Sequence, residues 1–155
     1  MSRYSLAAAS ALIVLSMPNA ANAQATVTLT SGPLIDVCIL EATSGGVLTR
    51  NGEGTLLGSE ESGGSPGTLT VVALGTSPTL TFQAPSISTP GGDSTTTGEI
   101  AYSSIGGADQ DYTDALSTAS AGALLDTFTV HGRLLNDDGF LAGTYQISTV
   151  VTCSQ

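Results

Sequence analysis

Apolar and polar residues alternate along the C-terminal part of the chain, residues 139–153. From Thr144 onward, one parity is formed by Tyr145, Ile147, Thr149, Val151 and Cys153. Because successive side chains of a β-strand point to opposite faces of a sheet, this period of two predicts a half-buried strand. We expect this segment to be the last strand and to close the domain.

Similar short runs occur upstream, separated by turns rich in glycine, proline and serine. Residues 34–42 are apolar on both parities, which predicts a central strand covered on both faces. Residues 68–74 and 78–84 predict a hairpin. A second hairpin, with its turn at 136–139, is predicted to join a strand at 123–135 to the last strand.

Two longer segments, 85–98 and 106–122, are rich in small polar residues and predict surface loops. The first has an irregular edge strand at Ile87 as an alternative, and the second a short helical turn at 112–116. Asp126 falls on an apolar parity, which predicts a register shift before Phe128 or a partner for the carboxylate.

Many short strands without a convincing helix are typical of a β-sandwich or a barrel. The length best fits a single all-β domain, an Ig-like antiparallel β-sandwich of about seven to nine strands. We place this domain at residues 24–155.

The first 23 residues have the pattern of a secretory signal peptide. Arg3 precedes the apolar run 6–15, and the small residues Ala21, Asn22 and Ala23 form an A-x-A cleavage site. The alternative is a membrane anchor, but the run is shorter than the roughly 20 apolar residues that cross a bilayer. We therefore predict export to the periplasm, the cell surface or the medium, with no membrane span after cleavage.

The chain is acidic, with 13 Asp and Glu against three Lys and Arg. After removal of Arg3, the cations would be Arg50 and Arg133. Two separated cations cannot neutralise a run of phosphates, so nucleic-acid binding and attraction to anionic lipid are disfavoured.

The two cysteines, Cys38 and Cys153, lie near the two ends of the predicted domain. In an exported chain, such a pair predicts a disulfide, because exported proteins meet oxidising compartments. The alternatives are a metal-binding pair or two buried thiols. A metal site would need further ligands, and the chain has one histidine.

That histidine, His131, lies on the polar parity of its strand and is expected to be a surface residue rather than a base or ligand. The carboxylates that could serve in glycoside hydrolysis are Glu41, Glu53, Glu60, Glu61 and Glu99, and nothing in the sequence pairs them across a cleft. We predict no catalytic residues, no cofactor and no enzyme activity, with a small secreted hydrolase as the least favoured alternative.

Two acidic segments could hold calcium, which prefers six to eight oxygen ligands. The first contains Asp109, Asp111 and Asp114, and the second contains residues 136–138. Neither has the EF-hand spacing. We interpret both as solvated turns and predict no metal site, with calcium binding left open.

The end of the chain resembles bacterial surface-fibre subunits. The resemblance lies in Phe128-Thr129-Val130, Gly132, and Ala142-Gly143-Thr144-Tyr145 with the alternating run to Cys153. Fimbrial subunits of chaperone–usher systems, and the related spore-coat-U-like and pilin-like families, close in a similar way. Two features differ: such subunits carry a tyrosine nearer the C-terminus, and their disulfide usually lies in the N-terminal half.

The resemblance implies that each subunit lacks a strand, which the N-terminal extension of a neighbour supplies. Residues 24–35, with Val27 and Leu29 on one parity, could be this donor strand. The alternative is that they form the first strand of their own sandwich, and a disulfide that joins both ends favours a self-contained domain.

The sequence thus predicts a non-enzymatic exported structural or surface protein, in particular a fimbrial or pilus-like subunit that associates with itself or with other fibre subunits. The alternative is a self-contained secreted binding module that recognises a glycan or a protein through its loops. The sequence identifies no ligand.

Overall fold

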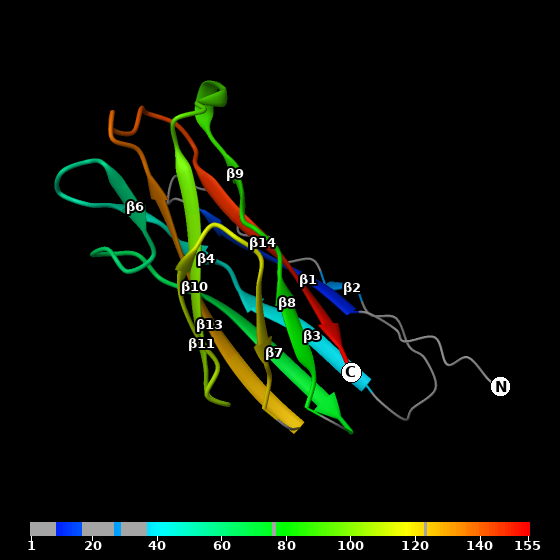
Figure 1. Ribbon diagram of the computed structural model, residues 1–155. Helices are drawn as coiled ribbons and strands as arrows, with labels where there is room; N and C mark the ends of the chain where they lie inside the picture. Colours follow the sequence, from blue (N-terminus) through cyan, green and yellow to red (C-terminus); the bar gives the residue numbers. More distant parts are fainter. Residues whose placement is uncertain (1–8, 17–26, 29–36, 76, 123) are drawn as a thin grey trace.

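The chain folds as an all-β sandwich of two sheets (Figure 1). The structure, a computed structural model, describes residues 9–16, 27–28, 37–75, 77–122 and 124–155. The described residues form fourteen strands, five of which are only two or three residues long, and one 3₁₀ turn, η1 (Pro90–Gly92). The expected all-β sandwich is confirmed.

The first sheet, sheet A, is centred on the C-terminal strand. Its strands run in the order β12 (Ser117–Ser120), β8 (Thr79–Phe82), β14 (Gln146–Ser154), β1 (Ala9–Ser16) and β2 (Val27–Thr28). Two short strands join it from the side: β9 (Ser86–Ser88) pairs with β14, and β4 (Gly46–Val47) pairs with β1. All of these pairings are antiparallel except that of β1 with β4.

The second sheet, sheet B, is centred on β13 (Leu124–Leu135). On one side of β13 lie β10 (Thr97–Ser104) and β11 (Asp109–Thr113). On the other side lie β7 (Gly67–Leu74) followed by β3 (Val37–Ser44), and further along β6 (Leu56–Gly58) followed by β5 (Thr49–Arg50).

The core lies between the sheets and follows the alternation that the sequence predicts. In β14, the side chains of Ile147, Thr149, Val151 and Cys153 are buried. Three aromatic rings from both sheets meet in the middle: Phe82 stacks on Tyr102 with ring centroids 4.0 Å apart, and Phe128 packs against both. Such aromatic contacts add to the stability that burial of their area provides.

Both predicted hairpins are wrong in their connectivity. Strands β7 and β8 belong to different sheets, and so do β13 and β14. The turn at Asn136 is present, with the N–H of Gly139 donating to the Asn136 carbonyl, but the chain then crosses to sheet A. The apolar parities of consecutive strands therefore face each other across the core. The sequence does not show this difference, because each strand alternates in the same way whether it pairs in a hairpin or crosses to the other sheet.

Three local predictions also need correction. The described part of the apolar run 34–42 is not a central strand: β3 is the outermost strand beside β7 in sheet B, and Ile39 is 37% exposed. Residues 106–122 are not a loop, because they contain β11 and β12, which join opposite sheets. No helical turn forms at 112–116. The edge strand expected at Ile87 is present as β9.

Asp126 lies buried on the apolar parity of β13, and its carboxylate has the hydrogen-bond partners that a buried charge requires. Its side chain is 1% exposed and its carboxylate accepts hydrogen bonds from the N–H groups of Gly106, Gly122 and Thr127 and from the hydroxyl of Ser104. The register of β13 against β7 is continuous through this residue, so the alternative of a register shift is wrong. The carboxylate joins the turn after β10 to the start of β13.

The described part of the chain contains no helix long and apolar enough to cross a membrane.

Candidate functional site: the β1 position beside the C-terminal strand

The two sides of β14 are covered by very different parts of the chain. On one side, β14 pairs with β8 and β9. On the other side it pairs with β1, antiparallel and in unbroken register from Ala9 opposite Cys153 to Ser16 opposite Gln146 (Figure 1). Strand β1 falls within the predicted signal peptide. An eight-residue pairing therefore depends on a segment that export is predicted to remove.

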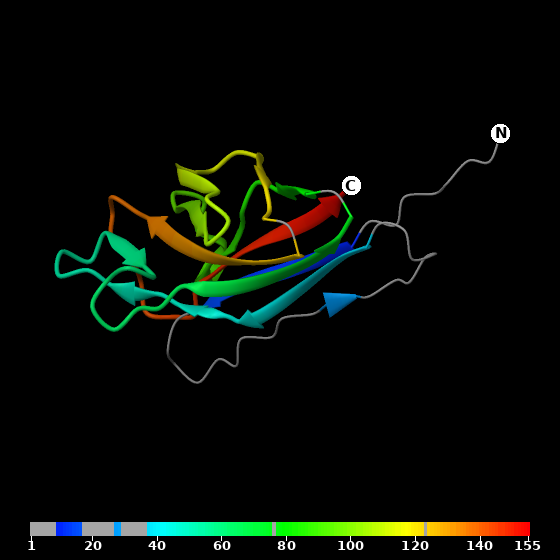
Figure 2. The ribbon, with the colours of Figure 1, turned by 90° about the horizontal axis from the view of Figure 1, so that it is seen from below.

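Strand β1 also closes the gap between the two sheets. It pairs with β4, in parallel orientation, through Leu15 and Ser16. It lies against β3, the outermost strand beside β7 (Figure 2). We use the term β1 position for this place between β14 on one side and β3 and β4 on the other.

The register places alternate residues of β1 opposite the buried residues of β14. Ala11 lies opposite Val151, Ile13 opposite Thr149 and Leu15 opposite Ile147. Thr149 is the polar member of this row, and its hydroxyl donates to the Gln83 carbonyl at 2.6 Å. Any strand in the β1 position therefore lies beside a row of β14 side chains that is apolar except for Thr149, whose hydroxyl already has an acceptor. The side chains of that strand must alternate between apolar and polar to match this row.

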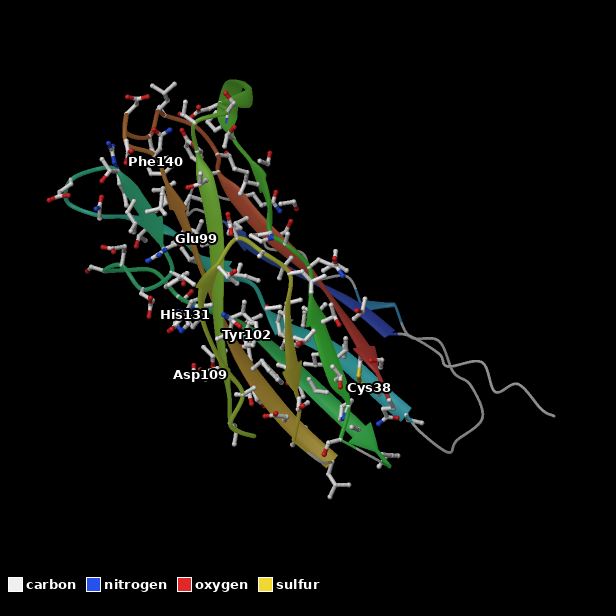
Figure 3. All side chains as sticks on the ribbon, in the orientation of Figure 1. Cys38, Glu99, Tyr102, Asp109, His131 and Phe140 are labelled. Carbon is white, nitrogen blue, oxygen red and sulfur yellow. A yellow bond between two sulfur atoms is a disulfide. The ribbon has the colours of Figure 1, made fainter. Side chains whose placement is uncertain are left out.

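The predicted disulfide is confirmed and lies at one end of this position. Cys38 of β3 and Cys153 of β14 are bonded, with Cα atoms 6.4 Å apart. Near the same end, the Gln155 side-chain amide donates to the carbonyls of Val37 and Leu74. We call this end, where β3 begins and β7 and β14 end, the disulfide pole. The opposite end, with η1 and the Asn136 turn, is the turn pole; Figure 3 labels Cys38 at the first and Phe140 at the second.

The predicted donor segment is described only in part. Val27 and Thr28 form β2, which pairs with Ala11 and Ser10 of β1. Leu29 lies outside the described residues. In this arrangement, Val27 is a strand residue next to the β1 position and not within it.

A polar cluster on the outer face of sheet B contains the single histidine. His131 Nδ1 lies 3.3 Å from Ser59 Oγ and 3.9 Å from Glu60 Oε1. The hydroxyl of Tyr112 donates to Glu60 at 2.8 Å, and burial together with this bond raises the pKa of Tyr112. Arg133 lies over the Tyr112 ring and donates from Nε to Glu99 at 2.6 Å.

The geometry of this cluster does not fit a serine hydrolase. In a catalytic triad, the serine and the acid contact different nitrogens of the histidine, whereas Ser59 and Glu60 both approach Nδ1. Residues 63–67 spell G-x-S-x-G, the motif of the nucleophile elbow in α/β-hydrolases. Ser65 in this motif lies on a bridge to Val47 and leads into β7, not on a strand-to-helix elbow.

The acidic segments contain no metal centre among the residues that the structure describes. Asp109 and Asp111 are exposed residues of β11, and Asp114 follows the end of that strand. Asn136 is buried instead: its amide donates to Asp93 and Thr96, and its oxygen accepts from the Asp138 N–H. The second segment is a structural turn.

A shallow hollow is the feature closest to the predicted binding loops. It lies between the turn after β10 and strand β12, and is lined by Gly106, Gly107, Ala108, Asp109, Thr118, Ala119 and Ser120. It has no aromatic side chain that could stack on a sugar. We find no arrangement there that selects a ligand.

Comparison with known proteins gives no family model, no curated protein and no solved structure that matches this chain.

Proposed function

We propose that the chain is an exported, non-enzymatic structural subunit of the fimbrial or pilus-like kind, whose processed form binds a strand from a second copy in the β1 position. By processed form we mean residues 24–155, the product of cleavage after Ala23. The observation that carries the proposal is the pairing of the whole of β1 with β14.

Cleavage would remove β1 and leave β14 with partners on one side only. The freed edge is long and regular, and its buried parity includes Ile147, Val151 and Cys153. An exposed edge of this kind is a template for a strand from another chain, because unpaired N–H and C=O groups and an apolar row are satisfied together. Strand addition from a neighbour would restore both.

The disulfide supports both export and this arrangement. Disulfides form in the oxidising compartments that exported chains reach. The bond between Cys38 and Cys153 joins the two strands that flank the β1 position, so the walls of the gap stay together when β1 is absent. A disulfide that joins the ends of the domain is therefore compatible with a missing strand.

The N-terminal segment of the processed chain has the pattern that the gap requires. Val27 and Leu29 alternate with Thr26, Thr28 and Thr30, so that one parity is apolar, as a strand beside the buried row of β14 requires. Residues 24–35 precede Cys38 in the chain and would have to leave their own domain to reach a neighbour. A second copy is therefore the simplest source of the strand.

The test is self-association of the processed chain. We expect size-exclusion chromatography and electron microscopy to show polymers of the wild type. Changing both Val27→Asp and Leu29→Asp should prevent them, because a charge cannot be buried beside Val151 without a partner. The matched control, Thr26→Asp with Thr28→Asp, adds the same charge on the opposite parity and should leave polymers in place.

A separate measurement tests the acceptor. A synthetic peptide of residues 24–35 should bind the Val27→Asp/Leu29→Asp variant and protect the β14 amides from hydrogen exchange. A processed wild-type chain that is monomeric at high concentration and already has protected β14 amides would contradict the proposal. That result would favour the self-contained binding module.

A further inference from the structure

A patch of exposed apolar side chains lies at the disulfide pole. Ile39, Val72 and Leu125 are aligned in one row across three adjacent strands, and Val37 lies opposite Leu74 in the next row. Leu74 is 49% exposed, Leu124 is 66% exposed and Leu125 is 64% exposed. Leu124 lies next to Leu125 but opposite the buried Ala73, on the other parity of β13. We call Val37, Ile39, Val72, Leu74 and Leu125, together with the adjoining Leu124, the disulfide-pole patch, because all of them lie at this end of the sandwich. Contiguous exposed apolar residues of this kind mark interaction surfaces.

The backbone of Leu124 gives an independent reason to treat the patch as functional. Leu124 has φ of +71°, the one positive φ recorded at a non-glycine residue in the described chain. Leucine rarely adopts this conformation, because its Cβ crowds the backbone. A strained backbone that presents an exposed leucine is not explained by the packing of the isolated domain, and such strain collects at sites of interaction.

The register of β1 determines which parts of two copies would meet, if strand addition occurs as proposed. A strand that takes the direction of β1 enters beside Cys153 and ends beside Gln146, at the turn pole of the accepting copy. The donating copy resumes its own fold at Val37, at its disulfide pole. If Leu29 lies near the end of the β1 position, seven residues join them, which span at most about 25 Å.

The turn pole also presents an exposed leucine. Leu141 follows the Asn136 turn and is 72% exposed, next to Phe140, whose buried ring packs edge-on against Tyr145 with the ring centroids 5.1 Å apart. A backbone hydrogen bond holds the segment of Leu141 against the loop before β6, because the Phe140 N–H donates to the Gly54 carbonyl. An apolar patch and an exposed leucine therefore lie at the two ends that a short link would bring together.

We infer that the disulfide-pole patch of one copy packs against the exposed Leu141 of the copy that accepts its N-terminal strand. This second contact rests on the proposed strand addition and is distinct from it. Because the two surfaces differ, the contact is head-to-tail and repeats without closing, which builds a filament rather than a symmetric dimer. This contact would fix the orientation of successive subunits.

The first experiment removes the patch without touching the β1 position. In the processed chain, Leu124→Asn keeps a residue that tolerates positive φ, and Leu125→Thr keeps a strand former. We expect the concentration at half-polymerisation to rise by about tenfold or more, as loss of two partly buried leucines predicts. The matched control is Ile105→Thr with Leu116→Thr, which removes two exposed apolar residues outside the patch and should have no effect.

The second experiment maps the contact. Chains carrying Leu124→Cys and chains carrying Leu141→Cys are mixed, allowed to polymerise and treated with a short bismaleimide. We expect cross-linked dimers from this mixture. The control mixture of Leu116→Cys with Leu141→Cys should give far fewer. Equal yields from both mixtures would overturn the inference.

The outcomes separate the two proposals. The Leu124→Asn and Leu125→Thr substitutions are also placed in the Val27→Asp/Leu29→Asp variant. This fourfold variant should bind the peptide of residues 24–35 as tightly as the Val27→Asp/Leu29→Asp variant does. Equal binding would show that the domain is folded and accepts a strand. Polymers unchanged by the leucine substitutions would overturn the inference and leave strand addition standing. A wild type that neither polymerises nor, as an acceptor, binds the peptide would remove both.

Discussion

The two sheets of the sandwich differ in how they would survive export. Every described strand of sheet B lies between Val37 and Leu135, well inside the processed chain. Sheet A contains β1, which the predicted cleavage removes, and β1 is the strand through which β2 and β4 join that sheet. With β1 removed, sheet B would keep all of its described strands, whereas β14 in sheet A would lack a partner on one side.

The two poles differ in a similar way. The disulfide pole is closed by a covalent bond between β3 and β14. The turn pole is closed by hydrogen bonds, in which Asn136 after β13 donates to Asp93 and Thr96 before β10. Neither device uses β1. The contacts that close the two poles are thus independent of the strand that is predicted to be lost.

The largest expected effect is the difference between the full-length and the processed chain. With residues 1–23 retained and the disulfide formed, β1 should cover β14; without them, the monomer should be less stable by on the order of 5 kcal/mol, at roughly 0.5–1.5 kcal/mol per lost hydrogen bond. Hydrogen exchange followed by mass spectrometry should show faster exchange at 146–153 in the processed monomer.

Strand β13 provides the internal control for that measurement. Its neighbours β7 and β10 are in the processed chain, so exchange at 124–135 should be nearly the same in both forms. Equal protection of β14 in both forms would mean that another segment covers this edge, and the contrast between the sheets would fail.

Loss of the disulfide is the next effect in size. It closes a separation of 115 residues, for which the chain-entropy model gives up to about 4.7 kcal/mol. We expect Cys38→Ala with Cys153→Ala to cost about 3–4 kcal/mol in chemical unfolding. The loss should be greater in the processed monomer than in the full-length chain, because β1 no longer bridges β3 and β14. Reduction of the wild type is the control, since it breaks the bond without leaving a cavity.

Substitution of Asp126 tests whether the stability of sheet B depends on the presence of β1. Asp126→Ala would leave the N–H groups of Gly106 and Gly122 without their acceptor, at a cost of about 2–3 kcal/mol. The loss should be the same with or without residues 1–23. Asp111→Ala, at an exposed position of β11, should change the free energy of unfolding by less than about 0.5 kcal/mol. A loss at Asp126 that depended on β1 would show that the sheets are coupled.

Alternation along single strands was predictable from the sequence, but the assignment of strands to sheets was not. The buried row of β14 follows from the period of two, and the disulfide was expected because an exported chain with two cysteines meets an oxidising compartment. The path from β7 to β8 was missed because a hairpin and a crossover between layers produce the same alternation. The prediction that β3 is covered on both faces was wrong for a different reason. Ile39 points outward and belongs to the disulfide-pole patch, and from the sequence alone an exposed apolar residue cannot be told from one that a second layer covers.

The β1 position shows the limit of sequence reasoning about the site. Residues 6–15 have the apolar character of a signal peptide, and nothing in their pattern indicates that Ala9–Ser16 also pairs with β14. The position depends on which strand ends without a partner, a property of the whole topology. The donor segment, by contrast, could be proposed from Val27 and Leu29 alone.

The smallest expected effect is the pH dependence of the turn pole. The backbone N–H and hydroxyl of Thr95, with the hydroxyl of Thr96 and the Asn136 amide, donate to the Asp93 carboxylate. These bonds hold the pKa of Asp93 below its ordinary value of 3.8. A group with a lowered folded pKa adds stability that is complete above its unfolded pKa and is lost as the pH falls through the folded pKa.

Acid titration of the wild type against Asp93→Asn measures this contribution. We expect the wild type to be the more stable at neutral pH and the difference to shrink below pH 3.8, because only the wild type has the charge to lose. Carbon-13 NMR of the Asp93 carboxyl should give the lowered pKa directly. The shift should be equal in the full-length and processed chains, since none of its donors touches β1. A shift that appeared only with β1 present would show that the turn pole, too, depends on the missing strand.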